Sequence, residues 1–212
     1  MIVNSFVLDH MIKHYVFCVK FSSYHYHNNR QNVICSSSHD KTIRFWDFKH
    51  NKQLQIYDEH IHSVNGIEFS SFNCGRYLCS GSGKTIRLWD VETSKSLYIF
   101  NGHEDTVCCV DISPLQSNNN DNKMNNIGMI GGNGYTICSG SWDNTIRIWD
   151  IETTKQMNVL KGHKHFVNSV KYGSNELMNI ILSGSSDKSV CLWDIRSDKQ
   201  IQLFNGHSKY CM

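Results

Sequence analysis

One dipeptide, Trp-Asp, recurs four times along the 212-residue chain, and it restricts the possible folds more than any other feature. The Trp residues are separated by 43, 60 and 44 positions. A nearly fixed period of this length indicates that the chain repeats one supersecondary unit. The pairs stand at Trp46-Asp47, Trp89-Asp90, Trp149-Asp150 and Trp193-Asp194.

A similar run of residues leads into each pair, which excludes coincidence. The run is Lys-Thr-Ile-Arg-Phe from Lys41, Lys-Thr-Ile-Arg-Leu from Lys84, Asn-Thr-Ile-Arg-Ile from Asn144 and Lys-Ser-Val-Cys-Leu from Lys188. An Asn- and Gly-rich insert at 116–134 explains the longer middle spacing, and we expect it to be a loop between two strands. The units then span approximately 10–57, 58–100, 101–160 and 161–204, and a further unit begins at 205–212.

Within each unit, four short apolar segments are separated by turn residues. In the fourth unit they lie at 166–172, 180–183, 189–193 and 201–204, and two of them alternate apolar with polar residues. Such segments are typical of short β-strands. No segment has the length and the 3.6-residue period of an amphipathic helix. We therefore predict an all-β fold.

Composition and charge exclude several classes of protein. The net charge is +2, and no block of like charge offers a surface for nucleic acid or an anionic membrane. No apolar run approaches the roughly 20 residues that cross a bilayer. The first ten residues lack the basic region of a secretory signal, so we expect a protein of the cytoplasm or nucleus that is not secreted.

The nine cysteines suggest neither disulfides nor a zinc site. Cys35, Cys79 and Cys138 occupy the same position of three successive units, each directly before a Ser, and no C-x-x-C pair occurs. Equivalent residues of different units cannot pair with one another. We therefore expect reduced thiols in the core.

These units resemble the WD-repeat family of β-propellers, in which each blade is a four-stranded antiparallel sheet. The family places a Gly-His pair before each unit. Here it appears at Gly102-His103, Gly162-His163 and Gly206-His207, with Glu59-His60 as a weaker version. Apolar residues follow each His at +4, +7 and +9, but Ile12 takes the His position of the first unit, between His10 and His14.

The resemblance implies a hydrogen-bond chain in each blade, from Trp to Ser, from Ser to His and from His to Asp. Two units hold the whole set, and two lack part of it: the first has no aligned His, and in the second Gly83 replaces Asp. The predicted members are His103, Ser139, Asp143 and Trp149; His163, Ser183, Asp187 and Trp193; His60, Ser80 and Trp89; Ser36, Asp40 and Trp46.

Ser, His and Asp together also invite a hydrolase interpretation, with His103, Ser139 and Asp143 as a triad. Against it, the set is repeated, whereas an active site is needed once, and the indole N–H would occupy the Ser oxygen. We predict a structural network and no catalytic residue. An alkylphosphonate that labels Ser139 would favour the hydrolase.

Other motifs carry no cofactor or metal. His25-Tyr-His27, His60-Ile-His62 and His163-Lys-His165 would each put two imidazoles on one face of an extended strand, but zinc needs three or four ligands. The run from Gly81 to Thr85 lacks the first glycine of a phosphate loop and leads into a strand, so it is a turn. The glycines between 128 and 134 belong to the insert.

Trp142 is the only Trp outside the four pairs, and it sits in the turn before Asp143. The resemblance places this turn on the face that most often holds partners, and an aromatic residue among polar ones is typical of a binding hot spot. A role in covering only the edge of its own blade stays open. The other candidate partner-binding residues are His39, His62, Asp105, His165 and Ser186.

The function that follows is a non-catalytic scaffold or adaptor for other proteins or peptides, without cofactor or small-molecule substrate. A subunit that recruits substrates to a ubiquitin ligase is the alternative, since Trp193-Asp-Ile-Arg196 resembles a short motif by which WD-repeat proteins bind ligase adaptors. Propellers have about four to eight blades, and this family typically seven. We therefore expect an incomplete ring, and a strand-like segment at Ser5–Leu8 resembles an outer strand.

Overall fold

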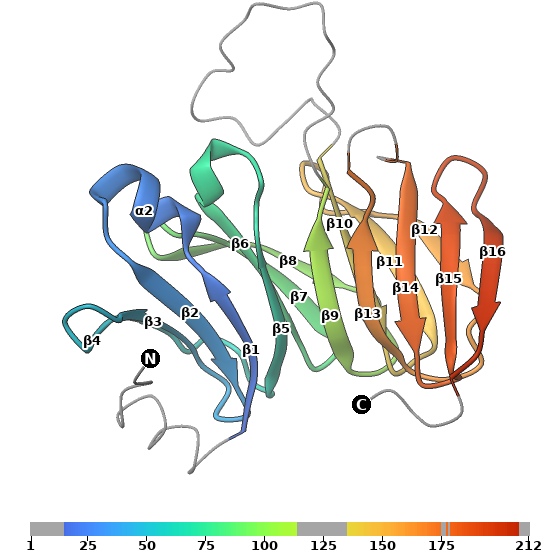
Figure 1. The fold of residues 1–212 in the computed structure, drawn as a ribbon, viewed down its shortest axis with the longest axis horizontal. Helices are drawn as coiled ribbons and strands as arrows, with labels where there is room; N and C mark the ends of the chain where they lie inside the picture. The colour runs from blue at the N-terminus through green and yellow to red at the C-terminus, as the bar shows by residue number, and fades with distance from the viewer. Residues whose placement is uncertain (1–14, 114–134, 175–176, 178, 208–212) are drawn as a thin grey trace, which may run out of the picture.

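The computed structural model describes residues 15–113, 135–174, 177 and 179–207, which form four separate antiparallel sheets of four strands each (Figure 1). The strands of each sheet are consecutive in the chain. Figure 1 shows the sheets side by side, from the first at the left to the fourth at the right. The predicted all-β fold with propeller blades is confirmed.

We call the sheets blades 1 to 4. Blade 1 contains β1 (Val16–Phe21), β2 (Val33–Ser38), β3 (Ile43–Asp47) and β4 (Lys52–Tyr57). Blade 2 contains β5 (Val64–Phe69), β6 (Tyr77–Ser82), β7 (Thr85–Asp90) and β8 (Lys95–Asn101). Blade 3 contains β9 (Val107–Ile112), β10 (Thr136–Ser141), β11 (Thr145–Asp150) and β12 (Gln156–Lys161). Blade 4 contains β13 (Val167–Tyr172), β14 (Ile180–Ser185), β15 (Ser189–Asp194) and β16 (Lys199–Asn205).

The Asp of each Trp-Asp pair stabilises the turn between the third and fourth strands of its blade. Its Oδ1 accepts a backbone N–H two or three residues ahead, which is the hydrogen bond of an Asx turn. The donors are Lys49 for Asp47 (2.9 Å), Glu92 for Asp90 (3.0 Å), Thr153 for Asp150 (2.8 Å) and Arg196 for Asp194 (2.9 Å).

Three apolar cores join the blades, one between each pair of neighbours. In each core an outer-strand side chain packs against the next blade. Tyr57, for example, stacks on Trp89 with ring centroids 4.9 Å apart. Cys35, Cys79 and Cys138 are fully buried in these cores, which confirms their prediction as core residues, and burial raises the pKa of each thiol.

Helix α2 (Ser23–Asn29), between β1 and β2, and the one-turn η1 (Asn73–Gly75) were not predicted. The prediction that the three histidine pairs lie on strands is also wrong. His25 and His27 lie on α2, and the pairs around His60 and His163 lie in loops. Seven residues are too few to display a helical period; α2 is held instead by His25, which is buried against Phe45 and hydrogen-bonded to Ser22 (2.8 Å).

The 116–134 insert connects β9 to β10, the first and second strands of blade 3, as predicted, but its residues are outside the described part of the chain. The predictions for Ser5–Leu8, for Ile12 and its neighbouring histidines, and for 208–212 also fall outside it. None of the helices in the described ranges is long and apolar enough to span a membrane.

Candidate functional site

A hydrogen-bond chain of four side chains crosses blade 4 and another crosses blade 3. In blade 4, Trp193 Nε1 donates to Ser183 Oγ (2.7 Å), which lies 2.7 Å from His163 Nε2. His163 Nδ1 lies 2.8 Å from Asp187 Oδ2. The equivalent distances in blade 3 are 2.9, 2.7 and 2.7 Å, and its members are Trp149, Ser139, His103 and Asp143.

The chains of blades 2 and 1 are shorter. In blade 2, Trp89 Nε1 donates to Ser80 Oγ (2.8 Å), which lies 2.7 Å from His60 Nε2, and the chain ends there because Gly83 has no carboxylate. In blade 1, Trp46 Nε1 donates to Ser36 Oγ (2.9 Å). Asp40 instead accepts from Thr42 Oγ1 (2.6 Å) and Arg44 Nη2 (3.1 Å).

The electrostatics of the blade 3 chain favour a neutral His103 imidazole and an ionised Asp143 carboxylate. Burial lowers the pKa of His103, and it lowers that of His60 to about 3 with help from the nearby Arg87. Burial raises the pKa of Asp143, but hydrogen bonds from His103 and Thr145 outweigh it and leave that pKa well below its usual range. The proton of His103 therefore stays on Nδ1, which donates to Asp143, and Nε2 accepts from the Ser139 hydroxyl.

The serines of the two complete chains are inaccessible. Ser139 is 0% exposed and Ser183 1%, and each oxygen already accepts the indole N–H. A nucleophile must reach a substrate carbonyl, which these oxygens cannot do in this arrangement.

We expect backbone amides of blades 3 and 4 to exchange with solvent more slowly than those of blades 1 and 2. The two complete chains tie the loop before the first strand to the turn between the second and third, and such ties raise the free energy of local opening. Hydrogen exchange followed by mass spectrometry measures this. Equal protection of all four blades would contradict it.

A cavity of about 470 Å³ opens at the end of blades 1 to 3 where Trp142 lies. It brings together three of the six predicted partner-binding residues, Trp142, His39 and His62. They come from different blades, since His39 and Trp142 lie in turns between second and third strands and His62 precedes β5. The other lining residues are Phe17, Ser63, Asn65, Gly83, Lys84 and Thr106.

Trp142 does more than cover its own blade. Trp142 is 44% exposed, and its ring stacks on Phe166 of the next blade, with centroids 5.0 Å apart. Its backbone N–H donates to the carbonyl of Thr106 (2.9 Å), which holds the turn in place. The ring thus stands at the boundary between the cavity and blade 4.

The other three predicted residues do not line this cavity. His165 packs edge-on against Phe166, with ring centroids 4.3 Å apart. Ser186 accepts a hydrogen bond from Asn168 Nδ2 (2.7 Å), and an Asp105 carboxylate oxygen accepts from the backbone N–H of Thr106 (2.7 Å). They extend the same face toward blade 4.

The missing Asp of blade 2 makes room for His62. Gly83 is the first residue of a two-residue turn and has φ 50°, a left-handed conformation that favours glycine. A Cβ there would lie 2.5 Å from His62 Cδ2. The run from Gly81 to Thr85 is therefore a hairpin turn that supports the cavity wall.

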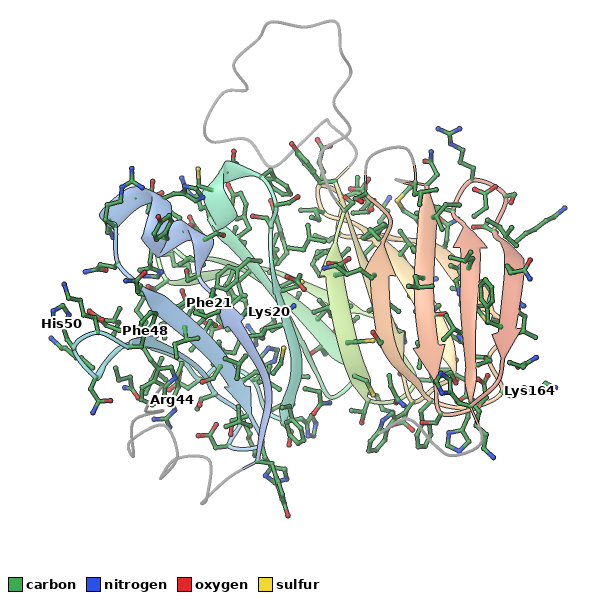
Figure 2. All side chains as sticks on the ribbon, in the orientation of Figure 1. Lys20, Phe21, Arg44, Phe48, His50 and Lys164 are labelled. Atoms are coloured by element: carbon green, nitrogen blue, oxygen red, sulfur yellow. The ribbon has the colours of Figure 1, made fainter. Side chains whose placement is uncertain are left out.

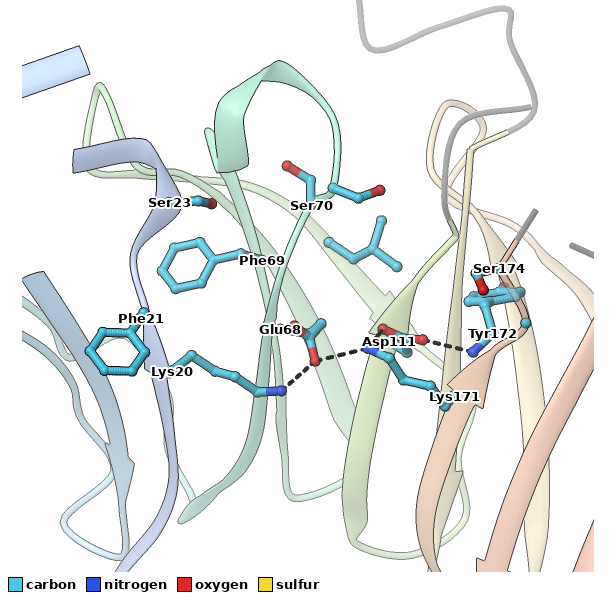
Figure 3. A pocket seen from close by; sticks show the side chains of 13 residues that line it. Lys20, Phe21, Ser23, Glu68, Phe69, Ser70, Asp111, Lys171, Tyr172 and Ser174 are labelled. Carbon is cyan, nitrogen blue, oxygen red and sulfur yellow. Dashed lines mark hydrogen bonds and ion pairs between the residues drawn. The ribbon is translucent and has the colours of Figure 1, made fainter. Parts of the chain in front are cut away.

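A second cavity, of about 360 Å³, lies at the other end of the first strands and was not predicted (Figure 3). Lys20 Nζ lies 2.6 Å from Glu68 Oε2, and Lys171 Nζ lies 2.8 Å from Asp111 Oδ1 and 3.3 Å from Glu68 Oε2. All four residues hold one repeat position, directly before the last apolar residue of the first strand. That shared position was a signal in the sequence.

Comparison with known families agrees with this geometry. A family profile described as WD domain, G-beta repeat matches residues 5–47, 51–90, 94–150 and 154–194. These matches cover most of the chain. It belongs to the WD-repeat family.

The chain is also similar to parts of several proteins whose names indicate different roles. The chain is 26% identical over 157 residues to the E3 ubiquitin-protein ligase COP1 of Arabidopsis thaliana. The aligned region covers 74% of this chain and 21% of the relative. It is 26% identical over 144 residues to Cell division control protein 4 of Saccharomyces cerevisiae (66% and 18%). It is 29% identical over 119 residues to Guanine nucleotide-binding protein subunit beta-2 of Caenorhabditis elegans (55% and 27%). The chain thus spans about a fifth to a quarter of the length of these relatives.

The WD repeats and the blades are offset by one strand. The second matched repeat, 51–90, begins with β4 of blade 1 and ends with β7 of blade 2. Each of the last three matched repeats therefore spans two blades, so the sequence unit itself connects neighbours.

Proposed function

We propose that this WD-repeat chain is a non-catalytic scaffold or adaptor that binds other proteins or peptides through the cavity beside Trp142. The observation that carries the proposal is that three blades converge there on a partly exposed Trp, two His side chains and Phe17, which is 47% exposed. Exposed aromatic residues at the wall of a concave site are typical anchors of protein recognition.

The lining favours a peptide with an acidic residue beside an apolar one. It contains Lys84, His39 and His62 but no Asp or Glu, so it offers positive charge and N–H donors. We expect no nucleic acid, membrane or small-molecule substrate as partner, because the net charge of the chain is only +2 and no block of like charge occurs in it. The buried serines support a role without catalysis, and the buried thiols are compatible with the cytoplasm or nucleus.

Trp142→Ala is expected to weaken peptide binding by about thirtyfold or more, because loss of a hot-spot aromatic costs at least about 2 kcal/mol. Peptides selected from a random phage-displayed library on the immobilised chain supply the ligand, and calorimetry compares the variants. Ile61→Ala is the matched control, since Ile61 is 74% exposed and outside the lining. Equal binding by Trp142→Ala would refute this site.

A substrate-recruiting subunit of a ubiquitin ligase is the second candidate. Two observations favour it: one relative is named an E3 ubiquitin-protein ligase, and Arg196, directly after Trp193-Asp-Ile, is exposed in the turn before β16. The test is a pull-down in which the chain recovers ligase adaptor subunits and Arg196→Ala does not. Recovery of none, or equal recovery by both, would exclude this motif as the docking site.

A further inference from the structure

The face of blade 1 that points away from blade 2 carries apolar residues like those of an inter-blade core, but no blade of the described part of the chain packs against it. Phe21 is 76% exposed, whereas Phe69, at the same position of blade 2, is 9% exposed. Phe48 is 46% exposed, and its equivalent Val91 only 1%. Phe21 and Phe48 lie edge to face with centroids 6.5 Å apart (Figure 2), so they form one apolar patch, joined by Val19.

The outer face of blade 4 carries the complementary half. Phe204 of β16 is 49% exposed, whereas the equivalent Phe100 is fully buried against blade 3. Leu182 of β14 is 44% exposed, at the position where blades 1 to 3 bury a Cys. In the described part of the chain, blades 1 and 4 thus present two unlike faces, each of which matches one side of the three inter-blade cores.

Gly184 and Gly206 of blade 4 indicate independently that this face is shaped for a neighbour, because the equivalent glycines of blade 3, Gly140 and Gly162, have one. A Cβ at Gly140 would lie 2.6 Å from Val167 Cγ1 of the next blade, and one at Gly162 would lie 2.9 Å from Trp193 Cη2. Their equivalents, Gly184 and Gly206, would meet nothing closer than 3.9 Å. Gly140 and Gly184 lie within strands, where glycine lowers stability and often marks the close approach of another backbone or side chain.

We propose that a second copy of this chain occupies both faces, so that two four-bladed arcs close into one eight-bladed ring. Blade 4 of each copy packs on blade 1 of the other. Phe204 and Leu182 then face Val19, Phe21 and Phe48 of the second copy, and Gly184 and Gly206 provide the close approach that Gly140 and Gly162 provide within the chain.

A second copy is the occupant because it presents both required faces at once. A two-fold axis through the centre of the proposed ring makes the two contacts identical and covers the exposed faces of blades 1 and 4 in both copies. Eight blades lie within the range of known propellers, about four to eight. Each contact would resemble the contacts that already join neighbouring blades, and the two together would bury both apolar patches. Exposed apolar patches of this kind favour association.

The test is the mass of the 212-residue chain in solution, measured by light scattering over a dilution series. We expect about twice the 24.5 kDa mass of one chain. Phe21→Glu and Phe204→Glu should each be monomeric, because every contact of the ring contains one residue of each kind. Both side chains are exposed in the single chain, so neither variant buries a charge, and circular dichroism verifies their folds. Ile61→Glu is the control and should remain a dimer.

Mixing the two variants decides the geometry. One of the two contacts is then wild type on both sides, so Phe21→Glu and Phe204→Glu together should form a dimer that neither forms alone. A monomeric wild type would overturn the proposal. So would a dimer broken by only one of the variants, which indicates pairing of like faces, or growth into open polymers, which indicates that the arcs do not close.

Discussion

Trp149→Ala is expected to lower the free energy of unfolding by roughly 3–5 kcal/mol, the usual range for removal of a large buried aromatic residue. Trp149 is 1% exposed, and its ring lies 6.0 Å from that of Phe100 on blade 2 and 5.9 Å from that of His103. The substitution opens a cavity between two blades. It also removes the indole N–H that donates to Ser139 Oγ in the hydrogen-bond chain of blade 3.

The measurement is denaturant unfolding in a Phe204→Glu background, in which association does not contribute. Trp142→Ala provides the matched control, since it removes the same residue type from the same blade at a site that is 44% exposed. We expect it to lower stability by only about 0.5–1.5 kcal/mol, because it removes the stacking contact with Phe166 but opens no buried cavity. Similar losses in the two variants would show that the Trp of the Trp-Asp pair has no special structural weight.

Gly140→Ala is expected to destabilise the chain by roughly 1–3 kcal/mol, because it overpacks the contact between blades 3 and 4. The added methyl would lie 2.6 Å from Val167 Cγ1 and 2.7 Å from Cys109 Sγ. Val167 cannot move away freely, since it is fully buried.

Gly184→Ala is the control for that effect, at the same position of blade 4. The nearest atom to its new methyl would be Ser169 Cβ at 3.9 Å, so unfolding of the Phe204→Glu monomer should be unaffected or slightly harder. In the wild-type background the same change should weaken the dimer. Equal destabilisation by the two alanines would mean that the inter-blade contact does not impose the glycine.

The periodic parts of the fold could be predicted from the sequence because each is repeated. Four copies of one pattern locate the strands even where a single copy, such as Ile180 to Ser183, is short. The helix α2 occurs once, has seven residues and depends on the burial of His25, so no period revealed it. The histidine pairs were wrongly placed on strands for a related reason, since alternation over three residues occurs in loops and helices as well.

The candidate site was only partly accessible from sequence. The turn that carries Trp142 could be located, but which turns of neighbouring blades share a cavity depends on how the blades pack. His39 and His62 meet Trp142 there, while Asp105, His165 and Ser186 do not line it. The charged cluster of the other cavity was missed because only the apolar positions of the first strands were compared across repeats.

The ion pairs of that second cavity also bear on the shape of the arc. Lys171 belongs to blade 4 and Glu68 to blade 2, so their contact spans two blades that do not adjoin. An ion pair between blades 2 and 4 restrains the distance between them and so limits how far the arc of blades can straighten. Because the Lys171 side chain is 59% exposed, dissolved salt screens that link. We therefore expect the curvature of the four-blade arc to depend on ionic strength as well as on packing.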